Sequence, residues 1–319
     1  MIFTTKVNIP KSPFRIGYED SVLTLGSCFA ENIGTRLENA FFLSFINPSG
    51  VLYNPMSVGQ GIRYLLSEKE FTGENLFQSG SLWNSFAHSS AFSATSVDEA
   101  LQKMNSRLIA ARSFLAETNV IIITLGTAWI FENAEKGNVV ANCHKQPANQ
   151  FIRRRLNVDE IVCEFSEVIE LLLKRNPQLK FVYTVSPIRH WKDGAHENTV
   201  SKSTLHLAVN ALEMKYDCVD YFPAYEIMID ELRDYRFYAS DMFHPSEQAV
   251  DYIWQRFSET YFSEETLDLK KELEQLRSDL NHRPIHPETT EYQQFVASVE
   301  KKKDGLIENY PFLRVRISG

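Results

Sequence analysis

The stretch Val120-Ile121-Ile122-Ile123-Thr124-Leu125-Gly126 decides the fold, because it is a short and almost wholly apolar run that ends on a glycine. A strand with apolar side chains on both faces is typical of a parallel sheet that helices cover on each side. Patterns of helical period precede the run at residues 97–117 and follow it at 157–175. The sequence therefore predicts a buried strand near the centre of a helix-covered sheet.

Short β-type runs and helical patterns alternate on either side of this stretch, through about residue 262. The predicted helices cover residues 28–41, 56–67, 97–117, 157–175, 198–215 and 246–262. The predicted strands are Val22–Gly26, Phe42–Ile46, Val120–Gly126, Phe181–Ser186 and Val219–Phe222. This alternation predicts a three-layer α/β/α doubly wound sandwich with a five-stranded, mainly parallel sheet of the flavodoxin-like kind.

Two regions depart from the alternation. Residues 68–96 are rich in Ser, Gly, Asn and aromatic residues, and we expect a long insertion over the sheet edge that forms part of a pocket wall. From Glu264 onward the chain is charged and helical over 264–280, is broken at 282–287, and is helical again over 289–307. We therefore expect an α/β domain at 1–263 and a helical appendage at 264–319 packed on it.

Composition excludes several classes of protein. The 319 residues carry 33 Lys+Arg against 41 Asp+Glu, a net charge of −8, which argues against nucleic acid as a partner. The basic clusters at 153–155 and 301–303 are expected on solvated helix faces. No apolar run reaches the length of a membrane span, so no membrane partner is expected. The sequence does not indicate an oligomeric state.

Cysteine usage and the N-terminal residues predict a location. The four cysteines are scattered without a Cys-x-x-Cys pair, which is typical of reduced thiols. The first residues lack a basic segment followed by an apolar one, so no secretory signal is indicated. A cytoplasmic protein is the expectation.

The first candidate for chemistry follows the first predicted strand, in Gly26-Ser27-Cys28-Phe29-Ala30. Ser27 has two interpretations: a helix N-cap, or a nucleophile at the sheet edge with the helix N-terminus donating N–H groups to an oxyanion. Cys28 lies where a helix start can make a thiol reactive. Because successive residues at a helix start point in different directions, we expect Cys28 to be a small buried apolar residue instead.

The second candidate opens the last helix of the predicted domain, in Ser240-Asp241-Met242-Phe243-His244-Pro245-Ser246. Asp241 and His244 are three residues apart, so in a turn the carboxylate reaches the imidazole. It then holds one ring nitrogen and leaves the other to take a proton from Ser27. Alternatively, Asp241 caps the turn and His244 is incidental. Because a serine follows the first strand of the same sheet, the pattern favours a triad of Ser27, Asp241 and His244.

These motifs resemble those of the GSCFA family, which is similar to a branch of the SGNH/GDSL hydrolase superfamily. The similar blocks, in order, are Gly26–Ala30, Tyr53–Pro55, Thr124–Trp129, Asn142–Lys145, Thr184–His190 and the Asp-x-x-His block. The resemblance implies that Ser27 is the nucleophile, His244 the base and Asp241 its orienting acid. It also implies acyl-ester hydrolysis or acyl transfer through an acyl-serine, without a metal or an organic cofactor.

The sequence departs from the superfamily where the oxyanion would bind. The usual Gly-Asp-Ser-Leu becomes Gly26-Ser27-Cys28-Phe29, and the usual Gly-x-Asn-Asp becomes Gly126-Thr127-Ala128-Trp129, which lacks the asparagine donor. A backbone N–H of Gly50, or a side-chain amide of Asn54 or Asn142, is a candidate replacement. The full set of candidate oxyanion and substrate-binding residues is Gly50, Asn54, Gly126, Thr127, Asn142, His144, Arg189 and His190.

Two of these positions also bear on the substrate and on metals. Arg189 and His190 follow a predicted strand, where they would meet an anionic or sugar substrate. His144 next to Cys143 is expected to line a pocket, because one such pair without further spaced ligands is weak support for zinc. We therefore expect no metal site.

Three functions remain open from the sequence. The favoured one is a serine esterase acting on an acylated carbohydrate or another small ester. The missing asparagine motivates a second, a non-catalytic module of the same fold that binds a ligand or acts as a scaffold. The third is an acyltransferase with the same triad, which differs only in what accepts the acyl group.

Overall fold

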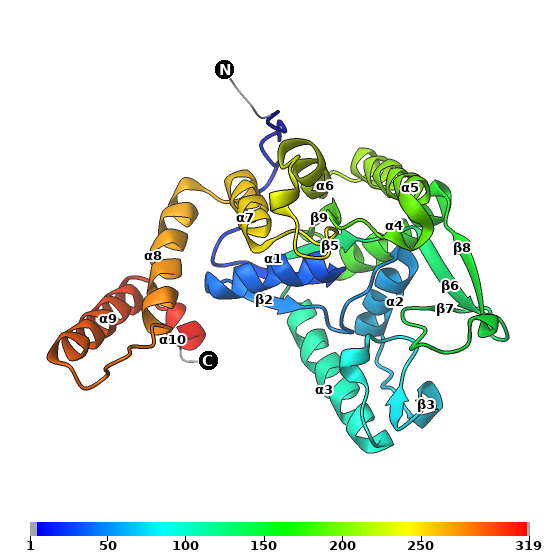
Figure 1. The fold of residues 1–319 in the computed structure, drawn as a ribbon, viewed down its shortest axis with the longest axis horizontal. Coiled ribbons are helices and arrows are strands. Elements are labelled where there is room, and N and C mark those ends of the chain that lie inside the picture. Colours follow the sequence, from blue (N-terminus) through cyan, green and yellow to red (C-terminus); the bar gives the residue numbers. More distant parts are fainter. Residues whose placement is uncertain (1–4, 318–319) are drawn as a thin grey trace.

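The central sheet of the protein is parallel throughout. A computed structural model describes residues 5–317 (Figure 1). Its five-stranded sheet has the order β10-β9-β5-β1-β2, and every neighbouring pair is parallel. The strands are β1 (Ser21–Gly26), β2 (Leu43–Ile46), β5 (Val120–Leu125), β9 (Lys180–Val185) and β10 (Val219–Tyr221). The predicted doubly wound sandwich is confirmed, with each strand within one or two residues of its expected limits.

Helices cover both faces of this sheet, because the strands are apolar on both sides. Ile121 and Ile123 pack into one buried cluster with α2 (Pro55–Leu66), α3 (Val97–Ala116), α4 (Val158–Arg175) and α5 (Gly194–Lys215). Val120 and Ile122 pack into the other with α1 (Cys28–Asn39), α6 (Ala224–Glu226) and α7 (Glu247–Tyr261). The side chains of a strand alternate in direction, which is why one run of residues serves two cores.

The strand register brings the ends of the central strands to one edge. Gly26 is level with Thr124, and Thr124 is level with Thr184. The residues after β1, β5 and β9 therefore lie together at the carboxyl edge of the sheet, where ligands bind in folds of this kind.

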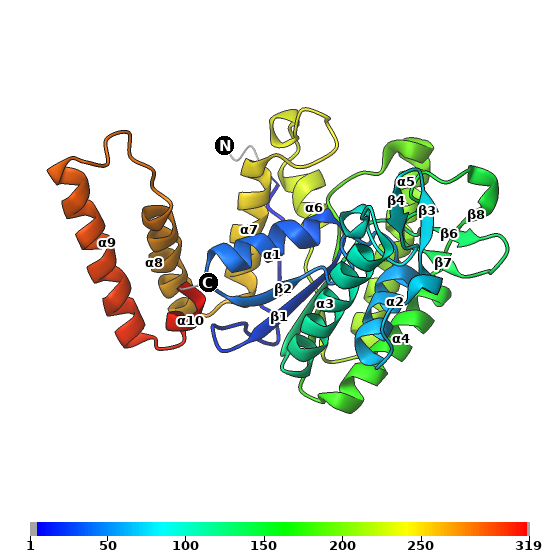
Figure 2. The same ribbon diagram turned by 90° about the horizontal axis from the view of Figure 1, so that it is seen from below.

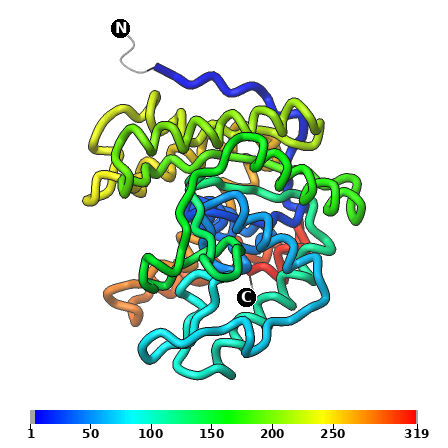
Figure 3. The backbone as a smooth tube through the Cα atoms, turned by 90° about the vertical axis from the view of Figure 1, so that its right-hand side faces the viewer, coloured from blue at the N-terminus to red at the C-terminus, as the bar shows by residue number. Residues whose placement is uncertain are grey.

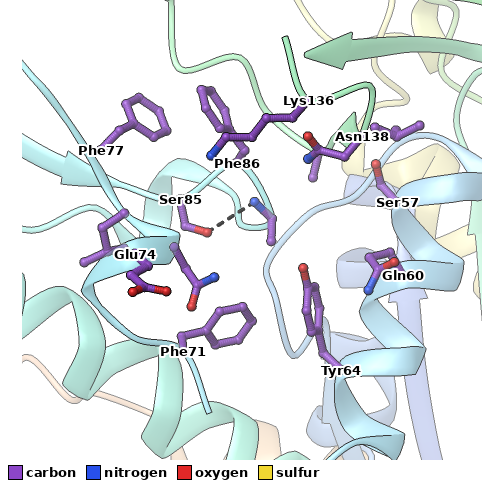
Figure 4. A pocket seen from close by; sticks show the side chains of 15 residues that line it. Ser57, Gln60, Tyr64, Phe71, Glu74, Phe77, Ser85, Phe86, Lys136 and Asn138 are labelled. Atoms are coloured by element: carbon purple, nitrogen blue, oxygen red, sulfur yellow. Dashed lines mark hydrogen bonds between the residues drawn. The ribbon is translucent and has the colours of Figure 1, made fainter. Parts of the chain in front are cut away.

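The predicted insertion at 68–96 forms a small hairpin, β3 (Phe77–Ser79) and β4 (Leu82–Asn84). With α2 it encloses a cavity of about 190 Å³. Figure 4 shows Phe71 and Tyr64 on one side of this cavity and Lys136 and Asn138 on another. The insertion thus forms a pocket wall, as predicted.

A second sheet was not predicted. Strands β6 (Trp129–Asn133), β7 (Val139–Val140) and β8 (Phe151–Arg155) form an antiparallel sheet of order β7-β6-β8. The basic cluster at 153–155 lies on β8, so its assignment to a helix face was wrong. The cluster packs on the neighbouring strand β6 instead of facing solvent from a helix. The guanidinium of Arg153 lies 4.3 Å from the ring centroid of Trp129.

The C-terminal helices lie at the opposite end of the molecule from β6–β8 (Figures 1 and 2). They are α8 (Glu264–Leu280), α9 (Thr290–Asn309) and α10 (Leu313–Ile317). Leu273 and Leu276 of α8 join the buried cluster of α1 and α7. Arg277 donates to the carbonyl of Glu38 at 3.1 Å. The tail is therefore packed on the α/β body, and a domain boundary at 263/264 stays a prediction.

The remaining segments are short or irregular. Figure 3 shows the N-terminal segment along the outside of the molecule, and the N–H of Ile16 donates to the carbonyl of Tyr261 at the end of α7. Within residues 5–317, no helix is both long and apolar enough to cross a membrane. Single turns occur at Gly73–Asn75, Ser90–Phe92, Ala148–Gln150, Trp191–Asp193, Ile227–Glu231 and Tyr235–Phe237.

Candidate active site

The turn between β1 and α1 is fixed by a glycine. Gly26 has φ +128°, and a Cβ there would lie 2.1 Å from the carbonyl oxygen of Thr124. Its own N–H donates to Asn47 Oδ1 at 2.9 Å, and its carbonyl accepts from the N–H of Leu52 at 2.8 Å. Only glycine fits this conformation and this close approach. The turn therefore presents the start of α1 at the carboxyl edge of the sheet.

Ser27 is the N-cap of α1. Its side chain is fully buried, at 0% exposure, and its Oγ accepts from the N–H of Phe29 at 3.3 Å. Its N–H donates to the carbonyl of Thr124 at 3.0 Å. No hydrogen bond joins Ser27 to His244 within the described residues. The cap interpretation is confirmed, and a role of Ser27 as nucleophile stays a prediction.

A cavity of about 360 Å³ opens at this edge of the sheet. Cys28, Tyr53 and Asn54 line one part of it, and Phe243 and His244 line another. Cys28 is partly exposed and not buried, which differs from the expected role. Cys28, the first residue of α1, therefore reaches the cavity from the turn, whereas the N-cap residue Ser27 does not.

Asp241 and His244 form the predicted contact. The distance from His244 Nδ1 to Asp241 Oδ2 is 2.5 Å. The other carboxylate oxygen accepts from the N–H groups of Phe243 and His244 at 2.9 and 3.0 Å. These backbone bonds, and then the imidazole, lower the pKa of Asp241 to about 2. The carboxylate thus holds Nδ1 and leaves Nε2 of a cavity-lining histidine available.

A second histidine and a lysine lie deeper at the same edge. His190 lines the cavity with its ring edge toward Tyr53, and its Nε2 is buried without a hydrogen-bond partner within the described residues. Burial, then Lys202 and His244, lower the pKa of His190 to about 4. Lys202 is buried and donates to the carbonyl of Ser186 at 2.7 Å. Burial lowers its pKa to about 7.

Three backbone N–H groups considered for the oxyanion already have acceptors. The N–H of Gly50 donates to the carbonyl of Asn47 at 2.8 Å. Those of Gly126 and Thr127 both donate to the carbonyl of Tyr53, at 2.8 and 3.0 Å. Gly126 matters in another way, since a Cβ there would lie 3.0 Å from that carbonyl and 3.1 Å from His190 Nε2. Of these three residues Thr127 alone lines the cavity, and none of the three N–H groups is free to donate to an oxyanion.

Asn54 is the predicted candidate with a side chain at the cavity. Its Oδ1 accepts from the N–H of Ser57 at 2.9 Å and so caps α2. The amide nitrogen has no hydrogen-bond partner within residues 5–317. Asn54 lines the cavity, and its amide nitrogen is the polar atom that the cap leaves unpaired.

Asn142 and His144 serve the neighbouring insertion. Asn142 Oδ1 accepts from the N–H of His144 at 2.8 Å. His144 Nε2 lies 2.8 Å from the carbonyl of Ser85. Neither residue lines the cavity next to Cys28. The structure therefore does not bring them together with the other candidates.

The cavity also holds Arg153, Asp193 and Phe131, which sequence reasoning did not assign to it. Arg153 forms two bonds of 2.6 Å to the carboxylate of Asp193, and both residues line the cavity with Trp129 and Phe131. The alternation of large side chains in Trp129-Ile130-Phe131 was the available signal for a strand with one face toward a pocket.

Arg189 differs from Arg153 in its pairing. It lines the cavity with its guanidinium 4.9 Å from the ring centroid of Trp191. Its Nε is buried without a hydrogen bond, and no carboxylate pairs with it within the described residues. Across residues 5–317 no group of three or more His, Cys, Asp or Glu side chains is placed to hold a metal ion.

Family models match most of the chain. The model described as GSCFA family matches residues 21–257. The model described as GSCFA domain protein, C-terminal domain, matches residues 273–316. No curated protein sequence matches the chain.

Two solved structures are similar at low identity. One is an acetyl xylan esterase from the rumen bacterium Butyrivibrio proteoclasticus, with 11% identity and a TM-score of 0.37. The match covers 79% of this chain and 64% of the esterase chain. The other is a carbohydrate esterase family 3 protein from Talaromyces cellulolyticus, with 12% identity, a TM-score of 0.32 and coverage of 79% and 98%.

Proposed function

The chain belongs to the GSCFA family, and we propose that it is an ester hydrolase that removes an acyl group from an acylated carbohydrate or another small ester. The observation that carries the proposal is the pairing of His244 with Asp241 at a cavity that the start of α1 also lines. A covalent acyl-enzyme on the β1–α1 turn would be the intermediate.

In this proposal His244 is the general base. Asp241 fixes the tautomer by accepting from Nδ1, so Nε2 takes the proton of the nucleophile and later returns it to the leaving alcohol. The carboxylate remains ionised at neutral pH, because backbone and imidazole donors lower its pKa to about 2. The carboxylate can therefore stabilise the imidazolium that forms when His244 takes a proton.

The oxyanion would form beside the N-terminus of α1. The N–H of Cys28 has no backbone acceptor within the described residues, and Asn54, whose amide nitrogen is unpaired there, lines the same cavity. A helix N-terminus favours negative charge. Each preorganised donor contributes about 3–4 kcal/mol to transition-state stabilisation. These two groups take the place of the asparagine donor that the sequence lacks.

The walls of the cavity favour a substrate with a ring or an apolar acyl group. Trp129, Phe131 and Tyr53 supply aromatic surface, and Arg189 and Arg153 supply donors. Aromatic faces combined with a few directed polar groups are typical of sites for small molecules. An acylated sugar fits this combination.

The test is hydrolysis of p-nitrophenyl acetate and a panel of acetylated sugars by the full chain. His244→Ala should lower kcat/KM by about 10³-fold or more. His286→Ala is the matched control, because that histidine also lies beside a carboxylate (Glu288) but is exposed in the tail. It should leave turnover unchanged.

Two results would contradict the proposal. If His244→Ala turned over esters as fast as the unmodified chain, the histidine would not be the base. If the unmodified chain bound acetylated sugars in calorimetry but hydrolysed no ester in the panel, the protein would be a binding module. Adding alcohol acceptors to the assay separates acyl transfer from hydrolysis.

A further inference from the structure

We propose that Cys28, and not Ser27, is the nucleophile of this site. The inference rests on the proposed function and names the atom that carries the acyl group. The two residues are neighbours in the β1–α1 turn, but their side chains go to different places. Cys28 lines the cavity with His244, whereas Ser27 does not line it.

The position of Ser27 does not suit a nucleophile. Its side chain is 0% exposed, and its Oγ is engaged by the N–H of Phe29 as the cap of α1. Its backbone N–H is held by the carbonyl of Thr124. An ester in the cavity would reach this oxygen only if the cap opened and the side chain changed its rotamer.

Burial raises the pKa of the Cys28 thiol, and three nearby donors act against this rise. Cys28 is the first residue of the 12-residue helix α1, and the backbone N–H groups of Cys28 and Phe29 both face its sulfur and lower its pKa. The ammonium of Lys202 acts in the same direction, while burial is the larger effect and raises the pKa. The thiol therefore keeps its proton at rest and needs a base, which His244 supplies.

A second buried group at the same cavity supports a reaction there. His190 Nε2 has no partner within the described residues, and its ring lies against Tyr53. Buried polar atoms are rarely left unpaired. His190 lines the same cavity as Cys28, so a rotation of its ring would turn this nitrogen toward a bound substrate.

The steps balance without an oxidant or a metal. Nε2 of His244 takes the thiol proton while Sγ bonds to the ester carbonyl carbon. The bond from that carbon to the alcohol oxygen then breaks, the proton passes to the departing alkoxide, and a thioester remains on Cys28. Water attacks the thioester with His244 as base, the carbon–sulfur bond breaks, the acid leaves, and the proton returns to sulfur.

The experiment maps the acyl group and compares variants of the full chain. The protein is mixed with p-nitrophenyl acetate, quenched in acid and analysed by peptide mass spectrometry. We expect acetyl on Cys28, removed by neutral hydroxylamine as a thioester is. Cys28→Ala should lower turnover by about 10³-fold, and Cys28→Ser should retain part of it because an oxygen nucleophile remains.

Matched variants keep the outcome interpretable. Cys218→Ala removes a partly buried thiol that does not line the cavity, and it should change neither labelling nor turnover. Ser27→Gly removes the hydroxyl, and glycine is tolerated at an N-cap, so acetyl should still appear on Cys28. Circular dichroism melts of each variant identify any loss of folding.

Two results would overturn the inference in different ways. Acetyl on Ser27, with turnover kept in Cys28→Ala and lost in His244→Ala, would leave the hydrolase function and reject Cys28. Absence of turnover by the unmodified chain toward every ester would reject the hydrolase function, and the nucleophile with it.

Discussion

The two halves of the site are built in different ways. The β1–α1 turn is part of the sheet: Gly26 and Ser27 are buried and hydrogen-bonded to Asn47 and Thr124 from neighbouring segments. The loop that holds Asp241 and His244 is bonded mainly to itself, and these side chains are 46% and 51% exposed. The position of the β1–α1 turn therefore depends on the folded sheet. The position of Asp241 and His244 depends on the hydrogen bonds of their own loop.

This difference separates stability from catalysis. A change in the turn disturbs contacts between β1, β5 and α1, so it should affect folding first. A change in the loop removes few contacts with the core, so it should affect turnover and leave folding intact. Substitutions on each side test this distinction.

The largest effect is expected in the loop, for Asp241→Asn. An amide at this position places an N–H₂ opposite His244 Nδ1 and favours the wrong tautomer, so kcat should fall by about 10³-fold or more. The melting temperature should stay the same, since the side chain is half exposed. Because the pKa of Asp241 is about 2, its ionisation should not shape the activity profile above pH 4.

Asp234→Asn is the control for this substitution. Asp234 precedes Asp241 in the same segment of the chain and accepts from the N–H of Arg236 at 3.0 Å. It should retain full turnover. If Asp241→Asn retained turnover as well, the carboxylate would be a cap and His244 would not depend on it.

The next effect is expected in the turn, for Gly26→Ala. The new Cβ would lie 2.1 Å from the carbonyl oxygen of Thr124, at φ +128°. Part of the sheet must move, and we expect a loss of about 3 kcal/mol or more in the free energy of unfolding. Urea titration followed by fluorescence measures it.

Gly137→Ala separates the two causes of that loss. Gly137 also has a positive φ, of +68°, but a Cβ there would meet nothing within 4 Å. It should cost about 1 kcal/mol, from backbone strain alone. Equal losses in the two variants would mean that the close approach to β5 does not hold the turn.

The elements that the sequence predicted well are those in which local pattern and burial agree. The run Val120–Leu125 is apolar on both faces and lies in the centre of the sheet. The predicted meeting of Asp241 with His244 also depends on local spacing alone, and it is present. Local rules suffice where the structure follows from neighbours in the chain.

The elements that were missed depend on distant partners. Strand β8 reads as a charged segment, and it is a strand because Arg153 packs on Trp129 and Arg154 pairs with Glu132 across the sheet. The exposure of Cys28 depends on how α1 is rotated at the sheet edge. The sequence did contain a signal for the position of Cys28. When Gly26–Phe29 is aligned with the motif Gly-Asp-Ser-Leu, Cys28 falls at the position of the serine.

A smaller effect on turnover is expected for Asn54→Asp, at the wall between the two halves. A carboxylate still accepts from the N–H of Ser57 and caps α2, but it cannot donate to an oxyanion. Loss of one such donor lowers kcat by about 10²-fold or more, with the melting temperature kept. Asn157→Asp tests the same exchange at the cap of α4 and should leave turnover unchanged. An unchanged kcat in Asn54→Asp would place the oxyanion elsewhere.

The smallest effect concerns Arg189, whose guanidinium lines the cavity without a carboxylate partner within the described residues. An ester that carries a carboxylate or a phosphate would form an ion pair with it, whereas a neutral ester would only accept a hydrogen bond, which a glutamine also donates. Arg189→Gln should therefore raise KM about tenfold for an anionic ester, as expected for the loss of about 1.4 kcal/mol, and leave KM unchanged for a neutral one.

Arg155→Gln is the control, because Arg155 pairs with Glu197 and does not line the cavity. It should change KM for neither ester. Equal changes for both esters in Arg189→Gln would show that this residue supports Trp191, over which it lies, and does not read the charge of the substrate. The response of KM to substrate charge thus tests whether the side of the cavity that holds the proposed base also selects substrates.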